Sequence, residues 1–401
     1  MHNVRKVKEN LFWVGGNDRR LALFENIFPL SRGVSYNSYL LLDEKTVLFD
    51  TADKAVSEQF FANVTHVLGE RKLDYLVVDH MEPDHGALIE NLILRYPELK
   101  IIGNNKTFQI MKQFFNLDID ERAIVVKEGD TFSSGKHTLR FLMAPMVHWP
   151  EVMVTYDELD KILFSADAFG SFGALPGNIF DDELDINTEW EKDLRRYYSN
   201  IVGKYGAQVQ ALLKKAADLD IETICPLHGP VWRSDLEYIC GKYEKWSSYE
   251  AEEKAVVIAY ASMYGDTENA ANVLASKLAD AGVKNIAVYD ISNTHVSELI
   301  AEIFRCSHLV LAAPTYNGGI YPVMENLLTD MKALGVSKRT VAFVENGTWA
   351  PMAARQMQAR IEEMKNMTVL DATVTIKSAL KDEQETQLDA LCEAIVNSLK
   401  A

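Results

Sequence analysis

The chain has 401 residues, of which 48% are hydrophobic and 25% charged, and its formal net charge is -17 at pH 7. This length exceeds what one hydrophobic core usually supports, so we expect two domains. The composition is that of an ordinary globular protein and not of a disordered one. The negative charge argues against nucleic acid as a partner, because phosphates attract basic surfaces.

The longest apolar runs, such as "HLVLAAP" and "YLVV", are far shorter than the roughly 20 residues that a membrane-spanning helix needs. The first residues, "MHNVRKVKENLFWVGG", lack the apolar stretch and cleavage site of a secretory signal. We therefore expect a cytoplasmic protein that does not bind membranes. Its four cysteines are far apart and predict reduced core thiols, neither disulfides nor a metal pair: Cys225, Cys240, Cys306 and Cys392.

The first part of the chain, to about residue 245, alternates short apolar runs with turns. The stretch "NSYLLLDEKTVLFDTA" predicts a β-hairpin, because two apolar segments flank the turn "DEKT". The stretches "LDYLVVDH" and "KILFSADAFG" likewise place polar residues directly after apolar strands. Polar residues at strand ends are typical of a layered α/β domain.

Several of these polar residues are potential metal ligands. The segment "HMEPDH" contains His80, Glu82, Asp84 and His85, and His148, Asp167 and His228 follow later apolar runs. Taken alone, any one of these histidines is better explained as a hydrogen-bonded core residue. Together, the seven residues can surround two metal ions, with Asp167 as the bridge. We expect the remaining histidines to be structural or exposed: His2, His66, His137, His295 and His308.

This pattern, H-x-E-x-D-H followed by a lone His, an Asp and a His, resembles the metallo-β-lactamase fold. Glu82 stands where zinc hydrolases of that superfamily usually have a second histidine, and a carboxylate there favours iron. The chain therefore resembles the flavodiiron proteins, also called A-type flavoproteins. The resemblance implies one iron held by His80, Glu82 and His148, another held by Asp84, His85 and His228, and a bridging Asp167. The alternative is a lactamase-like domain without metal.

From about Glu252 the chain alternates regularly between strands and helices. Five strand patterns, each followed by a helical pattern, predict a doubly wound parallel sheet. The charged stretch Tyr243 to Lys254 marks the boundary. The expected fold is thus α/β, with a metallo-β-lactamase-like αββα sandwich over residues 1–250 and a flavodoxin-like sheet over residues 254–401.

In the second domain, "ASMYGDTE" joins the first strand to the first helix and suits a phosphate at a helix N-terminus. It is neither a dinucleotide nor a triphosphate motif. It resembles the flavodoxin phosphate loop, although a simple helix cap is the alternative. The loops "APTYNGGIYP" and "VENGTWAP" follow later strands at the same edge, where such sheets bind ligands. We therefore predict an FMN site made of Ser262, Met263, Tyr264, Gly265, Asp266, Thr267, Pro314, Thr315, Tyr316, Asn317, Gly318, Gly319, Asn346, Gly347, Thr348 and Trp349. The sequence "ENGTW" departs from the commoner glycine, serine and tyrosine pattern before the tryptophan.

A flavin domain joined to a diiron site predicts a terminal reductase. Two ferrous ions and one reduced FMN supply the four electrons that take dioxygen to water, and nitric oxide reduction to nitrous oxide needs fewer. We expect dioxygen to be reduced at least as well as nitric oxide. Family spacing places Tyr197 near the iron pair, where it would hydrogen-bond the oxidant unless it is only a core aromatic. Trp149 would shield the metals, and Asp50 is either a partner of a ligating histidine or a turn cap.

The resemblance also implies a head-to-tail homodimer, or a dimer of such dimers, in which FMN of one subunit serves the iron pair of the other. Because the sequence has no CxxC pairs for a fused rubredoxin, we expect an external electron carrier. The resemblance implies that this carrier is rubredoxin or a similar donor, and a reduced deazaflavin is the alternative. Two alternatives stay open. One is a dizinc hydrolase with an appended flavodoxin domain, and the other is a non-catalytic electron-transfer or sensor protein that has lost its metals.

Overall fold

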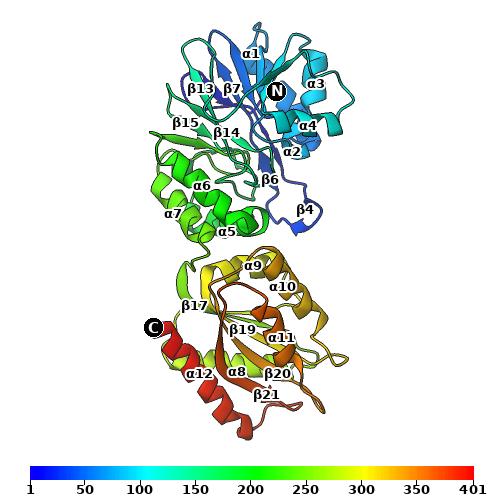
Figure 1. Ribbon diagram of the computed structural model, residues 1–401, viewed down its shortest axis with the longest axis vertical. Helices are drawn as coiled ribbons and strands as arrows, with labels where there is room; N and C mark the ends of the chain where they lie inside the picture. Colours follow the sequence, from blue (N-terminus) through cyan, green and yellow to red (C-terminus); the bar gives the residue numbers. More distant parts are fainter. The chain divides into compact units, whose positions relative to one another are not determined.

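The computed structural model describes residues 1–401. The chain divides into two compact units, and the first contains Met1–Tyr198 and Ala207–Glu244. The second contains Ser199–Gly206 and Lys245–Ala401 (Figure 1). No helix in either unit combines the length and apolar character that crossing a bilayer requires.

The first unit is built on two larger sheets. One has seven strands in the order β1-β2-β7-β8-β9-β10-β11 and the other has five in the order β12-β13-β14-β15-β16. The strands of the first sheet are β1 Arg5–Lys6, β2 Leu11–Trp13, β7 Tyr39–Leu42, β8 Thr46–Phe49, β9 Tyr75–Val77, β10 Lys100–Gly103 and β11 Ala123–Val125. Those of the second are β12 Thr131–Ser133, β13 Thr138–Met143, β14 Met153–Asp157, β15 Ile162–Phe164 and β16 Thr223–Cys225. Two short ribbons pair β3 Gly16–Asp18 with β6 Val34–Tyr36 and β4 Leu23–Phe24 with β5 Phe28–Pro29.

The two sheets face each other through aromatic side chains. The Phe49 ring of β8 stacks on the Phe164 ring of β15 at 3.7 Å between centroids, and Tyr39 of β7 meets the same ring edge-on. Strands β7 and β8 form the predicted antiparallel hairpin. The helices lie on the outside of this sandwich (Figure 1). They are α1 Ser57–Leu68, α2 Pro83–Gly86, α3 Ile89–Arg95, α4 Asn105–Phe114, α5 Glu191–Tyr197, α6 Gly206–Ala216 and α7 Leu236–Ser247, with the short 3₁₀ helices η1 Lys54–Val56 and η2 Asp181–Glu183 and the short π-helix η3 Ile186–Trp190. After α5, the π-helix η4 Tyr198–Val202 and the 3₁₀ helix η5 Gly203–Tyr205 belong to the second unit except for Tyr198.

The predicted metal ligands follow strands of both sheets. His80 comes three residues after β9, Asp167 three after β15 and His228 three after β16. His148 differs, because β13 ends at Met143 and not directly before the histidine. Pro145 cannot donate to a strand ladder, and Met146 has a φ of 66°, so the chain turns before it reaches His148.

The second unit contains a five-stranded parallel sheet in the order β18-β17-β19-β20-β21. This strand order and the regular alternation of strands and helices along the chain define the predicted doubly wound fold. The strands are β17 Glu253–Tyr260, β18 Ile286–Asp290, β19 Cys306–Pro314, β20 Thr340–Asn346 and β21 Thr368–Ile376. The helices are α8 Asp266–Asp280, α9 Val296–Arg305, α10 Pro322–Ala333, α11 Ala353–Glu362 and α12 Glu385–Lys400, with the short turn η6 Asp382–Gln384.

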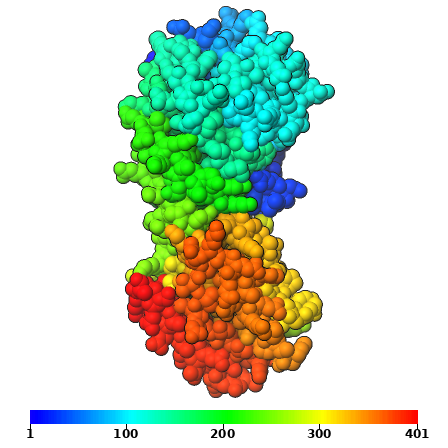
Figure 2. Space-filling model, viewed as in Figure 1, coloured from blue at the N-terminus to red at the C-terminus, as the bar shows by residue number.

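The core of the second unit includes buried faces of α8 and α12 packed on the sheet. Leu274 and Leu278 of α8 and Leu391 and Ile395 of α12 meet the strand residue Val310 in one cluster. The opposite side of α12 forms part of the outer surface, shown in red in Figure 2. The α/β architecture predicted for both parts of the chain is confirmed.

A buried arginine ties the segment before β17 to this sheet. Arg339 is 2% exposed and donates to the carbonyls of Ile303, Phe304 and Tyr249 at 2.6, 2.9 and 2.7 Å. Burial lowers the pKa of its guanidinium to about 10. The positive charge is therefore held by carbonyl dipoles at the end of α9 and in the segment before β17.

Candidate metal and flavin sites

The structure brings all seven predicted metal ligands together in the first unit. His80, Glu82, His148 and Asp167 form one group of possible ligands, and Asp84, His85 and His228 form another. In each group the ligand atoms lie within 4.8 Å of one another. Loops after β9, β13, β15 and β16 supply these residues, and α2 carries Asp84 and His85 on its single turn.

In the first group, the ligand atoms converge on one possible metal position. His80 Nε2 lies 3.2 Å from Glu82 Oε2 and 3.3 Å from Asp167 Oδ2. His148 Nε2 lies 3.0 Å from each of the same two oxygens. Ligands bound about 2.0–2.2 Å from a shared ion are separated by roughly these distances.

In the second group, the ligand atoms converge in the same way near the other carboxylate oxygen of Asp167. Asp167 Oδ1 lies 3.3 Å from His85 Nε2 and 3.6 Å from His228 Nε2. Asp84 presents one oxygen to each histidine, at 3.4 Å from His85 and 3.2 Å from His228. The Asp167 carboxylate thus faces both groups, one oxygen to each, as a bridging ligand must.

The charges of the cluster favour bound cations. Burial lowers the pKa of His80, but the neighbouring Asp167 outweighs it and the pKa lies well above its usual range. The pKa of His148 is raised to about 9 in spite of burial, through hydrogen bonds to Asp167 and Glu82. Burial raises the pKa of Asp167, and His80 and His85 outweigh it so that the pKa lies far below normal. The carboxylates therefore stabilise positive charge at the imidazole nitrogens, where a divalent cation would supply it.

Several polar atoms of the cluster have no other partner. Both carboxylate oxygens of Asp84 and Oδ1 of Asp167 are buried without a hydrogen bond. Buried carboxylate oxygens are costly unless they are paired or bind a metal. The donor set is oxygen and imidazole nitrogen without sulfur, which suits non-haem iron. The residues present therefore fit a pair of iron ions.

Residues outside the predicted set hold the ligand rings. Glu151 Oε1 lies 2.8 Å from His80 Nδ1 and accepts from Met81 N at 2.9 Å. The Ser35 carbonyl accepts from His228 Nδ1 at 2.8 Å. Glu151 follows His148 by three residues, a spacing that could have signalled it, but nothing in the sequence marks the Ser35 carbonyl.

Asp50 hydrogen-bonds to the backbone and to no ligand ring. Its Oδ1 accepts from Asp79 N at 3.0 Å and from His80 N at 3.1 Å. Burial raises the pKa of this carboxyl to about 7. Asp50 therefore caps the turn that carries His80, as in the second interpretation of this residue.

Two aromatic residues border the metal cluster. Tyr197 is fully buried, its ring centroid is 5.5 Å from that of His228, and its hydroxyl has no hydrogen-bond partner. Burial and Asp167 raise the pKa of Tyr197 well above 10, so the hydroxyl keeps its proton. Trp149 stands edge-on to the His80 ring at 5.5 Å and is half-buried.

The other histidines lie elsewhere. His2 and His66 stack on each other, His137 pairs with Asp157 at 2.7 Å, and His295 accepts from Ser297 N at the start of α9. His308 is buried at the start of β19. His137, Asp157 and Asp160 could also gather around a cation, but the His137–Asp157 pair already satisfies the charge of both partners.

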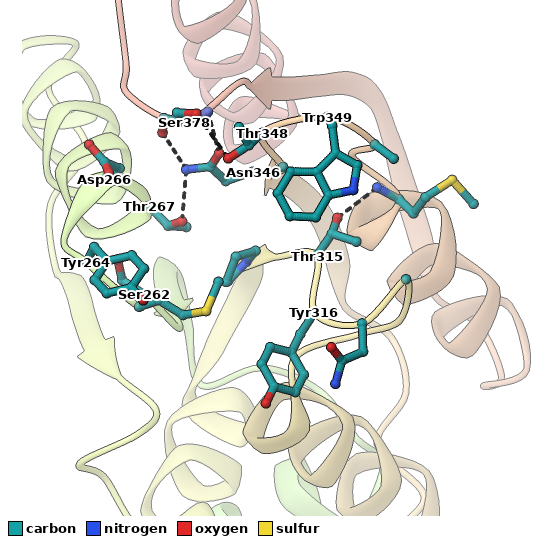
Figure 3. A pocket seen from close by; sticks show the side chains of 17 residues that line it. Ser262, Tyr264, Asp266, Thr267, Thr315, Tyr316, Asn346, Thr348, Trp349 and Ser378 are labelled. Atoms are coloured by element: carbon teal, nitrogen blue, oxygen red, sulfur yellow. Dashed lines mark hydrogen bonds between the residues drawn. The ribbon is translucent and has the colours of Figure 1, made fainter.

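The second unit has a pocket of about 520 Å³ at the carboxyl edge of its sheet. The loops after β17, β19 and β20 contribute side chains to it (Figure 3). All but two of the predicted flavin residues line the pocket. The exceptions, Gly265 and Gly319, shape their loops instead: Gly265 has a φ of 96°, and Gly319 exchanges backbone hydrogen bonds with Tyr316.

The first of these loops leads into a helix that presents free N–H groups. Ser262 Oγ accepts from Gly265 N at 3.0 Å, and α8 begins at Asp266 without a side-chain cap. Thr267 is buried at this helix start and lines the pocket. A phosphate placed there would meet unpaired backbone donors and the positive end of the helix dipole.

Hydrogen bonds also join the pocket segments that lie at or after the ends of β19, β20 and β21. Asn346 Nδ2 donates to Ser378 O at 2.7 Å, and Asn346 Oδ1 accepts from Ser378 N at 3.0 Å (Figure 3). Thr315 Oγ1 accepts from Met352 N at 2.8 Å and from Ala353 N at 3.2 Å. Ser378 and Met352 also line the pocket, and neither belongs to a motif that could be recognised in the sequence.

Flat aromatic side chains stand around this pocket with much of their area free. Trp349 is 91% exposed, Tyr264 93% and Tyr316 42%. Exposed aromatic residues gathered at a polar pocket indicate a binding surface for a planar ligand. A flavin ring with a phosphate tail fits both the helix start and these rings.

Both parts of the chain match known protein families. Residues 34–229 match the family described as ODP family beta lactamase, and residues 258–392 match the family described as flavodoxin. A nitric oxide reductase of Moorella thermoacetica is 31% identical over 375 residues, which cover 92% of each chain.

Solved structures of other proteins are similar to this chain over nearly its whole length. The rubredoxin oxygen:oxidoreductase of Desulfovibrio gigas has a TM-score of 0.92 and 29% identity, covering 99% of this chain and 98% of that one. A mutant flavo di-iron protein of Thermotoga maritima has a TM-score of 0.90 and 25% identity, with the same coverage. This chain is therefore a member of the flavodiiron protein family, an oxidoreductase whose cofactors are FMN and a pair of non-haem irons.

Proposed function

We propose that this chain reduces a small diatomic oxidant, dioxygen to water or nitric oxide to nitrous oxide, at its metal cluster with electrons passed through FMN. The observation that carries the proposal is the presence, in one chain, of a seven-residue histidine and carboxylate cluster and a flavin pocket. When bound, FMN supplies electrons in pairs and each iron supplies one.

The proposed metal positions follow the geometry of the two groups. His80, Glu82 and His148 would hold one iron, Asp84, His85 and His228 the other, and Asp167 would bridge them. The histidine nitrogens lie 3.0 to 3.6 Å from the two Asp167 oxygens, and these distances support the assignment. The family matches to residues 34–229 and 258–392 fall inside the domains we propose, residues 1–250 for the metals and residues 254–401 for the flavin.

The chain's own residues would orient the oxidant and control its water and protons. Tyr197 keeps its proton and has no partner for it, so it can donate a hydrogen bond to a ligand at the metals. Trp149 covers the His80 ring and would keep bulk water away. In the flavin pocket, Trp349 and Tyr316 would contact the ring system, while the start of α8 would hold the phosphate.

Relatives support both substrates and an external donor. The Moorella thermoacetica relative is named a nitric oxide reductase, and the Desulfovibrio gigas structure is named a rubredoxin oxygen:oxidoreductase. We propose rubredoxin or a similar small carrier as the donor, and a head-to-tail homodimer in which the flavin of one subunit serves the metals of the other. We keep the expectation that dioxygen is reduced at least as well as nitric oxide.

The decisive experiment measures consumption of each oxidant by the iron-loaded protein with reduced rubredoxin, with iron and FMN quantified. Rapid dioxygen consumption without peroxide, lost in His85→Asn and kept in the matched variant His66→Asn, is the expected result. Nitric oxide turnover that outruns dioxygen consumption under the same donor would reverse the order of substrates. Little turnover of either gas despite full iron and FMN would contradict the proposed reaction.

The dizinc hydrolase is the second candidate, because the first unit matches a beta-lactamase family. The carboxylate of Glu82 within the first ligand group speaks against it. Metal analysis separates the two functions. Zinc in the purified protein together with esterase activity would support hydrolysis, and iron without esterase activity would exclude it.

A further inference from the structure

The two metal positions are equal in the residues that face the ions. Each has two imidazoles and one terminal carboxylate, and one oxygen of Asp167 faces each position. Differences between the two ions must therefore come from what surrounds the ligands.

The ring nitrogens that point away from the metal positions differ in their hydrogen-bond partners. His80 turns Nε2 toward Glu82 and Asp167, so Nδ1 carries the proton and donates to the carboxylate of Glu151 at 2.8 Å. His228 donates from Nδ1 to the uncharged carbonyl of Ser35. The buried Nδ1 of His85 has no hydrogen-bond partner. Among these three rings, only His80 has a carboxylate as the hydrogen-bond partner of this outer nitrogen; the Asp50 carboxylate interacts with His85 electrostatically but makes no hydrogen bond to it.

The carboxylate of Glu151 is fixed in place. Its side chain is fully buried, and the same Oε1 accepts from Met81 N at 2.9 Å. Asn104 Nδ2 donates to the Glu151 carbonyl at 2.6 Å and so holds the backbone from the start of α4. A buried carboxylate without a strong partner is unfavourable, so the imidazole proton of His80 and the ion behind it are what balance Glu151.

A carboxylate that accepts the imidazole proton raises the basicity of the ring and strengthens its bond to a metal. A more basic ligand also stabilises the higher oxidation state of iron. We propose that Glu151 is a positioning residue that makes the two irons unequal, so that the ion held by His80, Glu82 and His148 binds more tightly and is oxidised first. This inference rests on the proposed assignment of the metal positions.

The test follows metal binding and does not depend on turnover. Metal-free protein receives one equivalent of iron-57 and then one of natural ferrous iron under anaerobic conditions, followed by one oxidising equivalent of ferricyanide. The expected Mössbauer spectrum shows the label in a single environment that becomes ferric. In Glu151→Gln, affinity for the first equivalent falls about 10- to 100-fold, and the label divides between two environments.

The control is Asp157→Asn, which disrupts a buried carboxylate and histidine pair of similar length outside the metal positions. It should bind and oxidise iron as the unaltered protein does. If Glu151→Gln fails to fold, Glu151→Asp keeps the charge and should retain the order of loading. Two bound irons without preference in the unaltered protein, or equal weakening of both in Glu151→Gln, would overturn the inference alone. Failure to bind a second iron would instead contradict the proposed metal site.

Discussion

At the scale of single residues, removal of the unpaired hydroxyl of Tyr197 tests whether this residue acts in the reaction or only packs in the core. A buried hydroxyl without a partner costs about 1–3 kcal/mol of desolvation, and Tyr197 is such a residue. Tyr197→Phe should therefore keep the fold and raise the free energy of unfolding slightly. If the hydroxyl donates to the oxidant, turnover should fall roughly tenfold or more.

Parallel measurements of thermal unfolding and gas consumption check this prediction. Tyr198→Phe is the comparison, because Tyr198 is also fully buried and its ring packs against Tyr243. Unchanged turnover in Tyr197→Phe would leave only the role of a core aromatic.

The ligands themselves could be predicted from sequence because their chemistry is local. His80, Glu82, Asp84 and His85 share one short segment, and their types restrict what they can bind. Glu151 could not be assigned, since its role depends on a tertiary approach to a ring 71 positions away in the chain. The same holds for Ser378, whose contact with Asn346 joins the loop after β21 to the end of β20.

At the scale of elements, the start of α11 depends on a residue from another loop. Met352 provides no side-chain cap, and Thr315 Oγ1 accepts from Met352 N and Ala353 N in its place. A lost helix cap costs about 0.5–2 kcal/mol. Thr315→Val should loosen the segment that carries Trp349 and raise the dissociation constant of FMN by roughly three- to tenfold.

Fluorescence titration of the flavin-free protein measures this effect. Thr329→Val is the matched control, because Thr329 lies on the exposed side of α10 and its hydroxyl bonds only within that helix. Equal FMN affinity in the two variants would show that the cap does not support the pocket.

Strand β19 carries a group that makes stability depend on pH. His308 is 5% exposed, and burial together with Lys254 lowers its pKa to about 4. In the unfolded chain the value is about 6.5, so the unfolded state takes up the proton first as the pH falls. The folded state therefore loses roughly 2 kcal/mol between pH 7.5 and pH 5.0 from this residue.

Comparison of urea unfolding at several pH values tests this sign. In His308→Asn, the loss of stability on acidification should be smaller than in the unaltered protein, whatever the absolute stability of the variant. An identical dependence on pH would mean that His308 does not titrate as described.

Whole strands were easier to predict than their ends. The five parallel strands of the second unit alternate with helices, and their apolar runs are long enough to mark them. The stretch "TLRFLMAPMV" suggested a strand that leads directly to His148, but apolar character continues past the point where Pro145 and Met146 turn the chain. Hydrophobicity reports burial, and it does not distinguish a buried strand from a buried turn.

At the scale of the whole molecule, each cofactor should stabilise its own unit. A ligand at a hundred times its dissociation constant adds about 2.7 kcal/mol to the unfolding of the part that binds it. Calorimetry of the full chain should show one transition that moves with FMN and another that moves when a chelator removes the metal. A single transition that responds to both would show that the two units unfold together.

The tryptophans differ strongly in their exposure to solvent, and this difference can be used in a measurement. Trp13, Trp190, Trp232 and Trp246 are at most 1% exposed, whereas Trp349 is 91% exposed. An aqueous quencher such as iodide therefore reaches Trp349 far more readily than these four, and a flavin seated beside it would absorb its emission. The purified protein thus contains an intrinsic optical reporter of flavin occupancy that needs no added label.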